Sequence, residues 1–268
     1  MSRYGSAFDR GQVMIDVAPP ILAALFAGLG LIVGSFLGLA SLRFPAGENI
    51  VRGRSRCGGC GRELLPWRMI PLVSYALARG HCHDCGASIP ARYPLMETTC
   101  ALIGIWAALS QPSLAAAAAT ALLGWLLLLI AVVDAEHFWL PDQLTLPLLV
   151  MGVLAAAFLE RITVLDAVIG VCAGFAALWL IGRAYRHLRG REGLGGGDPY
   201  LLAAGGAWVG WLGLPSVLVW GATAGLSVMV ARMLLKQPVS GQDRMPFGSF
   251  LALGIWLTWL FGPLGFPR

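Results

Sequence analysis

The chain has 268 residues, of which 57% are hydrophobic and 12% are charged, and its mean hydropathy is +0.74. This composition excludes an ordinary soluble domain and indicates a multi-span membrane protein. The net charge of +5 comes from arginines beside apolar runs, which favours contact with anionic lipid over nucleic-acid binding. No nucleic-acid partner is therefore expected.

Apolar runs of roughly 20 residues, the length that a spanning helix needs, recur along the chain. They are apolar on every side, whereas the strands of a membrane barrel would alternate between apolar and polar residues. The sequence therefore predicts an all-α membrane protein with about eight transmembrane helices, near residues 18–40, 94–110, 114–133, 143–159, 163–182, 199–213, 214–235 and 247–264.

Three segments follow from this pattern. Residues 1–40 are interpreted as a retained first span, because the apolar run is too long for a cleavable signal. The small residues of its GLGLIVGSFLGLA stretch predict close packing against another helix. Residues 41–92 form a polar loop with paired cysteines, and residues 93–268 form a helical membrane core.

Basic residues give the orientation. The stretches 41–92, 183–198 and 232–244 hold 15 of the 19 arginines and lysines, and the opposite segments hold 4. The positive-inside rule places these stretches in the cytoplasm and both termini outside. The loop 134–142 falls on the cytoplasmic side as well.

The first basic stretch contains four of the six cysteines, in the pattern C-x2-C, 21 residues, C-x2-C. Each C-x2-C turn directs two thiolates toward one point, and two such turns supply a closed tetrahedral zinc site. Disulfides are the alternative, but a reducing cytosol disfavours them. The sequence predicts a structural zinc ion held by Cys57, Cys60, Cys82 and Cys85.

The loop after the third predicted span contains two aspartates. Asp142 follows Pro141 and precedes an apolar run, so its carboxylate is expected to cap the next helix. Asp134 follows LLLLIAVV at the end of a helix, where a negative charge is unfavourable. Because Asp134 lacks such a structural role, it is the candidate catalytic residue of this loop.

A second candidate, Asp198, follows three glycines in GLGGGDPY. Glycines without side chains would let a substrate backbone lie close to the carboxylate. A phosphate-binding loop is disfavoured, because no lysine follows the glycines and no strand precedes them. A capping role, with Pro199 in the first turn of the next helix, is compatible with catalysis.

Both aspartates are expected in loops on one side of the membrane. A pair of carboxyls at a membrane edge is a functional-site hypothesis by default. Two such groups cannot both ionise cheaply when they meet. One would keep a proton while the other activates a water molecule for attack on a peptide carbonyl, so Asp134 and Asp198 are the predicted catalytic pair.

Together these motifs resemble the type IV prepilin peptidases, membrane aspartyl proteases of the GxGD type. The resemblance is carried by GSFLGLASLRFP at 34–45, the cysteine loop ending in RYPLMET at 92–98, VDAEHFWLPDQLTLPLL at 133–149, GGGDPYLLAAGGAWVGW at 195–211 and MPFGSFLALG at 245–254.

The resemblance implies an endopeptidase of the bacterial inner membrane. It would remove the basic leader of type IV prepilins, or of type II secretion pseudopilins, at the cytoplasmic face. By position, Asp134 and Asp198 match the catalytic aspartates of the family, and the four cysteines match its zinc ligands. Many members also methylate the new N-terminus with S-adenosylmethionine, which would be the second cofactor.

The chain departs from the family pattern at three places. Gly38 stands where asparagine is usual, Pro199-Tyr200 replaces the usual x-Lys, and Ser249 stands where proline is common. The first departure bears on methylation, and the second on substrate contact. Glu97 matches a glutamate of the family, and an interfacial pair with Arg92 explains it equally well.

Two other functions fit part of the sequence. A transporter could use the two aspartates as a proton or ion relay, but it would place them near the middle of the bilayer and would show repeated halves. A zinc-binding scaffold for a cytoplasmic partner would leave the GGGD loop without a role.

Overall fold

The structure is a computed structural model that describes residues 18–50, 55–191, 193–237 and 245–265. Within these ranges there are two isolated β-bridges and no strand, so the predicted all-α class is confirmed. The elements are α1 (Pro19–Arg43), the 3-10 helix η1 (Pro66–Met69), α2 (Val73–Leu77), α3 (Arg92–Ser110), α4 (Leu114–His137), α5 (Asp142–Leu159), α6 (Val164–Arg189), α7 (Asp198–Leu234) and α8 (Phe247–Phe261).

Five helices of the described residues, α1, α4, α5, α6 and α7, are long and apolar enough to cross a membrane. The predicted count of eight is not confirmed. Helix α8 is apolar but has only 15 residues, and α3 does not meet the same criterion of length and composition. The first 17 residues of the predicted N-terminal segment lie outside the described residues, and so do six of the counted arginines: Arg3, Arg10, Arg52, Arg54, Arg244 and Arg268.

Helix α7 is two helical stretches, 198–209 and 211–234, joined at Gly210. Gly210 has φ 70° and ψ 173°, a conformation that only glycine adopts readily. The second stretch runs back along α8, because Gly213 faces Thr258 and Gly221 faces Phe250. The sequence placed this break near residue 213, three residues too late.

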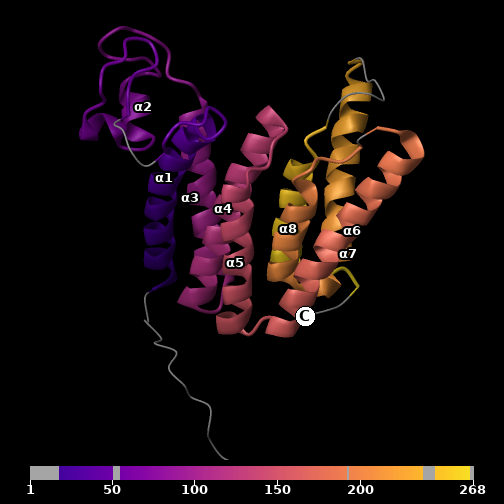
Figure 1. The fold of residues 1–268 in the computed structure, drawn as a ribbon. Helices are drawn as coiled ribbons and strands as arrows, with labels where there is room; N and C mark the ends of the chain where they lie inside the picture. Colours follow the sequence, from indigo (N-terminus) through magenta and orange to yellow (C-terminus); the bar gives the residue numbers. More distant parts are fainter. Residues whose placement is uncertain (1–17, 51–54, 192, 238–244, 266–268) are drawn as a thin grey trace, which may run out of the picture.

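Each helix of the bundle packs against one or more neighbouring helices (Figure 1). Helix α1 packs on α3, α3 on α4 and α4 on α8, while α7 lies against α5, α6 and α8. The small residues of α1 allow the first of these contacts: Gly30 and Gly34 lie directly against the α3 backbone at Cys100 and Glu97. This confirms the close packing that the glycines of the first span predicted.

One end of the bundle gathers helix termini that are far apart in the sequence. Arg92, the first residue of α3, pairs with Glu136 in the last turn of α4 at 2.6 Å. The start of α8 contacts the end of α4, and the start of α7 contacts the α4–α5 connection at Leu140. The lobe between α1 and α3, which carries η1 and α2, lies at this end (Figure 1).

Helices α6 and α7 approach each other closely at a pair of glycines. Gly170 and Gly206 face each other, and a methyl group on either one would overlap the backbone carbonyl of the other. Close contact of this kind, mediated by small residues, is what holds helices together in lipid. It fixes the short stretch 198–209, whose first residue is Asp198.

We predict that Gly206→Ala destabilises the protein by about 1–3 kcal/mol, because the added methyl forces α6 and α7 apart. Thermal unfolding of the detergent-solubilised protein measures the effect. Gly28→Ala is the matched control, since a Cβ at this helical position has no atom within 4 Å. Equal melting temperatures for the two variants would contradict the prediction.

Candidate active site and metal centre

Asp134 lies in the last turn of α4 and is 5% exposed. Its Oδ2 atom accepts a hydrogen bond from the backbone N–H of Ser249 at 2.7 Å. The Ser249 hydroxyl lies 3.2 Å from the same oxygen and 2.8 Å from the carbonyl oxygen of Ala131, so it can donate to either. The first turn of α8 therefore holds the carboxylate.

This contact corrects the view that Asp134 has no structural role. The first N–H groups of a helix have no partner inside the helix, and the helix dipole favours a negative charge there. Asp134 ends α4, where its charge is unfavourable, but it lies at the N-terminus of α8. Gly248 makes the approach possible, because a Cβ at that position would lie 2.9 Å from Asp134 Oδ2.

Asp198 is the first residue of α7 and is 3% exposed. The preceding residue, Gly197, occupies the cap position, and no side chain caps this helix. The Asp198 carboxylate instead accepts the backbone N–H of Gly195 at 2.9 Å. Both aspartates were expected in loops, but both belong to the ends of helices.

The structure brings Asp134 and Asp198 to one place. Leu140 lies between their supports: it faces Gly197, next to Asp198, and also Gly248, which touches Asp134. The two carboxyls are near enough for the charge of Asp134 to act on Asp198. A buried pair of acids, approached from glycine-containing backbone, can share one proton and activate water.

Other polar residues near this end differ from expectation. Asp142 is the first residue of α5 and makes no capping hydrogen bond, since Pro141 occupies the cap position. Glu97 is buried, and its Oε2 accepts the N–H of Leu72 at 2.8 Å. Arg92 pairs with Glu136 instead, so the alternative that joined Arg92 to Glu97 is wrong.

The three departures from the family pattern each have a local setting. Gly38 lies under the ring of Tyr93, where a Cβ would meet Cδ1 at 3.2 Å. Tyr200 packs edge-to-face on Phe175 of α6, with ring centroids 5.2 Å apart. Ser249 supplies the N–H that Asp134 accepts, and a proline has no such donor.

The cysteine lobe contains two copies of one turn. In the first, the N–H of Cys57 donates to the carbonyl of Arg62, and Gly61 donates back to Cys57. The second turn repeats both bonds at the same spacing, from Cys82 and Gly86. Gly61 and Gly86 have φ near +70° (69° and 72°), which explains the glycine after each C-x2-C.

The two turns bring the four cysteine Sγ atoms within 4.8 Å of one another. All four are free thiols in the structure. Hydrogen bonds from the backbone N–H groups of Cys60 and Gly59 lower the pKa of the Cys57 thiol to about 6, which favours the thiolate that a metal binds. Four convergent sulfurs fit a closed tetrahedral zinc site without a position for water.

An ion-paired carboxylate ties the second turn to the rest of the lobe. Asp84 lies between the guanidinium groups of Arg68 and Arg62, at 2.7 Å and 2.8 Å. The hydrogen bond from Arg68 is the main cause that lowers the pKa of Asp84, and the charge of Arg62 adds to it. The lobe is thus held by charge pairs as well as by the thiol cluster.

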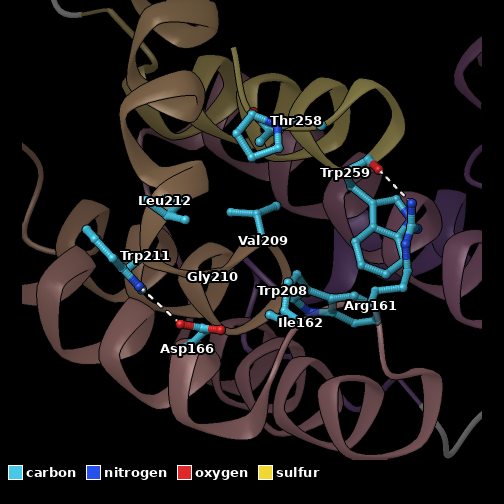
Figure 2. A pocket seen from close by; sticks show the side chains of 12 residues that line it. Arg161, Ile162, Asp166, Trp208, Val209, Gly210, Trp211, Leu212, Thr258 and Trp259 are labelled. Atoms are coloured by element: carbon cyan, nitrogen blue, oxygen red, sulfur yellow. Dashed lines mark hydrogen bonds between the residues drawn. The ribbon is translucent and has the colours of Figure 1, made fainter. Parts of the chain in front are cut away.

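A cavity at the opposite end of the bundle is a less suitable site. Figure 2 shows Arg161 stacked on the Trp259 ring, with its guanidinium 3.9 Å from the ring centroid, and Asp166 accepting the indole N–H of Trp211. Asp166 is also engaged by the hydroxyl of Thr163. A neighbouring cavity adds Glu160, but that residue is exposed and Asp166 is already engaged, so the two buried acids at the other end fit paired-acid chemistry better.

Family comparison agrees with this geometry. The profile of the bacterial peptidase A24 N-terminal domain matches residues 29–111, and that of the type IV leader peptidase family matches residues 121–230. The chain belongs to the type IV leader peptidase family. This is an aspartic protease family, so the chain is a membrane-bound aspartic peptidase of the prepilin peptidase type.

Curated relatives of this leader peptidase family cover most of the chain. A prepilin leader peptidase/N-methyltransferase of Pseudomonas aeruginosa is 37% identical over 87% of this chain and 88% of its own length. Proteins of the same name from Burkholderia pseudomallei and Aeromonas hydrophila are 40% and 39% identical, over 87% and 80% of this chain and 84% and 73% of their own lengths. No solved structure matches the chain significantly.

Sequence reasoning found the aspartates and the cysteines of this leader peptidase but missed the residues that hold Asp134. Gly248 and Ser249 follow Asp134 by more than a hundred residues, and neither carries a titratable group. The available signal was the MPFGSFLALG motif at 245–254, which the family resemblance marked but for which the residue types alone indicated no role.

We predict that the protein purified in reducing buffer contains about one zinc ion per chain, and that Cys57→Ser lowers this content by more than half, because three thiolates bind zinc less tightly than four. Elemental analysis by mass spectrometry measures the ratio. Cys172→Ser is the control, since Cys172 lies in α6 outside the lobe. Zinc-free wild-type protein would contradict the prediction.

Proposed function

We propose that this chain is a prepilin leader peptidase that cuts the basic leader from type IV prepilins or type II secretion pseudopilins. One observation carries the proposal: Asp134 and Asp198, 64 residues apart in the sequence, are both buried at the end of the bundle that bears the cysteine lobe, and Leu140 contacts Gly197 next to Asp198 as well as Gly248 against Asp134. The names of the curated relatives support the substrate class.

The surroundings of the two acids suggest their roles. Asp134 accepts the N–H of Ser249 at the N-terminus of α8, and both the donor and the helix dipole stabilise a negative charge. Asp198 accepts one N–H and lies beside that charge. We therefore assign Asp134 as the base that takes a proton from water, and Asp198 as the acid that donates one to the peptide.

The reaction would be a balanced hydrolysis. Water loses a proton to Asp134 and attacks the scissile carbonyl, while Asp198 protonates the carbonyl oxygen. As the tetrahedral intermediate collapses, Asp134 gives its proton to the departing amine of the mature pilin, and a hydroxyl of the gem-diol returns a proton to Asp198, so both acids recover their starting states. The leader leaves as a carboxylic acid, which loses its proton in water. The glycines 195–197 leave space for an extended substrate backbone beside Asp198.

We propose that this end of the bundle faces the cytoplasm. The basic stretches 41–92 and 183–198 adjoin it, and the positive-inside rule assigns such stretches to that side. The proposed division into an N-terminal segment (1–40), a zinc-binding loop (41–92) and a peptidase core (93–268) follows the same order. A leader rich in basic residues would then reach the aspartates without crossing the bilayer.

The proposal also includes a structural zinc ion and a second reaction, methylation. Zinc bound by Cys57, Cys60, Cys82 and Cys85 would supply structural cross-linking to the lobe and no chemistry at the peptide bond. Methylation of the new N-terminus, with S-adenosylmethionine as donor, is proposed because the relatives are named N-methyltransferases. No described residue is assigned to the methyl donor.

The position of the acids favours proteolysis over ion transport. Asp134 lies in the last turn of its helix and Asp198 at the first residue of another. A relay for transport would need carboxylates near the middle of the spans.

We predict that Asp134→Asn and Asp198→Asn each lower leader removal by at least about 100-fold, since each amide removes an acid or base from the reaction. The gel shift of a co-expressed prepilin measures processing. Asp142→Asn is the control, because Asp142 lies in the same connection without capping contacts. Processing that survives either of the first two substitutions would remove that residue from the pair.

We predict that Gly248→Ala lowers kcat by about 10- to 100-fold with little change in KM, because the new methyl displaces the Asp134 carboxylate. Initial rates on a purified prepilin measure both constants. Ser249→Ala is the neighbouring comparison, since it keeps the backbone N–H that Asp134 accepts and should lose less activity. A fully active Gly248→Ala enzyme would show that Asp134 does not need its place on α8.

A further inference from the structure

The lobe exposes an apolar surface that its own fold does not use. Between the two cysteine turns, the segment 65–77 forms η1 and α2, which contact each other and contain no buried residue. Trp67 is 64% exposed and Leu77 is 75% exposed. The large apolar side chains that are exposed in this segment are Leu65, Trp67, Met69, Ile70, Val73 and Leu77.

A hydrogen bond attaches this segment to α3 and so fixes its position along the axis of that helix. The N–H of Leu72 donates to Oε2 of Glu97 at 2.8 Å. Glu97 lies in the second turn of α3, and its backbone packs against Gly34 of α1. The segment is therefore held at the level of the second turn of α3, close to the end of the bundle where α1 ends and α3 begins.

The charge of the lobe matches an anionic membrane surface. Residues 41–92 contain eight arginines and three acidic residues, a net charge of +5 that equals that of the whole chain. Arg79 lies two residues after α2, and Arg68, which pairs with Asp84, lies inside η1. An apolar face flanked by arginines is the combination that holds a segment in the interface of a bilayer.

We propose that the segment 65–77 is a membrane-interface anchor: its apolar side chains lie among the headgroups and upper acyl chains of an anionic bilayer beside α1 and α3. A bilayer surface fits both observations: the Leu72–Glu97 hydrogen bond holds the segment beside α3, and the net positive charge of the lobe attracts anionic headgroups. The anchor holds the lobe against the membrane independently of any peptide chemistry, so the proposal does not rest on the proposed function.

The test uses the full-length protein in lipid nanodiscs of phosphatidylethanolamine and phosphatidylglycerol, with and without bromine on the acyl chains. Bromine quenches tryptophans that lie within the lipid. The difference between wild type and Trp67→Phe isolates the fluorescence of Trp67. Trp106, 51% exposed in α3, gives the lipid-facing reference, and Trp125, 4% exposed, gives the buried reference, each through its own phenylalanine variant.

We expect brominated lipid to quench the Trp67 component by at least about half as much as the Trp106 component. Quenching no greater than that of Trp125 would overturn the proposal. A second variant, Leu77→Trp in the Trp67→Phe background, moves the fluorescent probe to the other end of the segment. Its fluorescence should be quenched to the same extent as that of Trp67. Unchanged zinc content in each variant verifies that the lobe remains folded.

Two other occupants of this surface are distinguished by the same measurement. Discs that hold one copy of the chain exclude a second copy, so quenching must persist in them. If the surface instead binds a prepilin helix, Trp67 will be unquenched in its absence and will shift to shorter emission wavelengths when a prepilin is added. Either result would overturn the anchor.

Discussion

The contact between Asp134 and the first turn of α8 is the interaction on which the site depends. It joins residues 115 positions apart, at 2.7 Å, across the interface between α4 and α8. A buried carboxylate without donors would be costly, and a helix start without acceptors would be costly too. The carboxylate of Asp134 and the N–H groups at the start of α8 satisfy each other, so the packing of α4 on α8 holds the acid in place.

The second acid is placed by different means. Asp198 begins a short helical stretch whose position is set by the contact of Gly206 with Gly170 and by the reversal at Gly210. These glycines have no chemistry of their own. They allow the stretch to approach α6 closely and then turn back, which brings Asp198 beside Leu140 and the end of α4. The position of this carboxyl therefore depends on the close approach of helix backbones.

Much of this arrangement could be predicted from the sequence. The apolar runs located the long helices to within a few residues, except that α6 continues to Arg189, seven residues past the predicted end. The C-x2-C spacing predicted the cluster of four thiols, because such turns are local structures. The GGGD loop and the aspartate after LLLLIAVV were found as isolated carboxylates in apolar surroundings.

What could not be predicted depends on contacts between distant segments. The donors from α8 to Asp134 are backbone groups, which leave no trace in residue type. Glu97 was paired with the nearest arginine in sequence, but the fold offers it the N–H of Leu72, and Arg92 reaches Glu136 instead. The count of eight spans stays unconfirmed: α8 and the two stretches of α7 are short, and hydropathy alone does not say whether each of them crosses the bilayer.

The shortness of the helix that carries Asp198 has a consequence for the surrounding lipid. The twelve residues 198–209 extend about 18 Å, and the 15 residues of α8 about 22 Å, against a hydrocarbon layer of about 30 Å. Such a mismatch is relieved when the bilayer thins locally. Local thinning at this point would let bulk water reach the two acids. In the proposed reaction, water and the polar leader would then have access to the scissile bond, while the pilin helix would remain in the hydrocarbon layer.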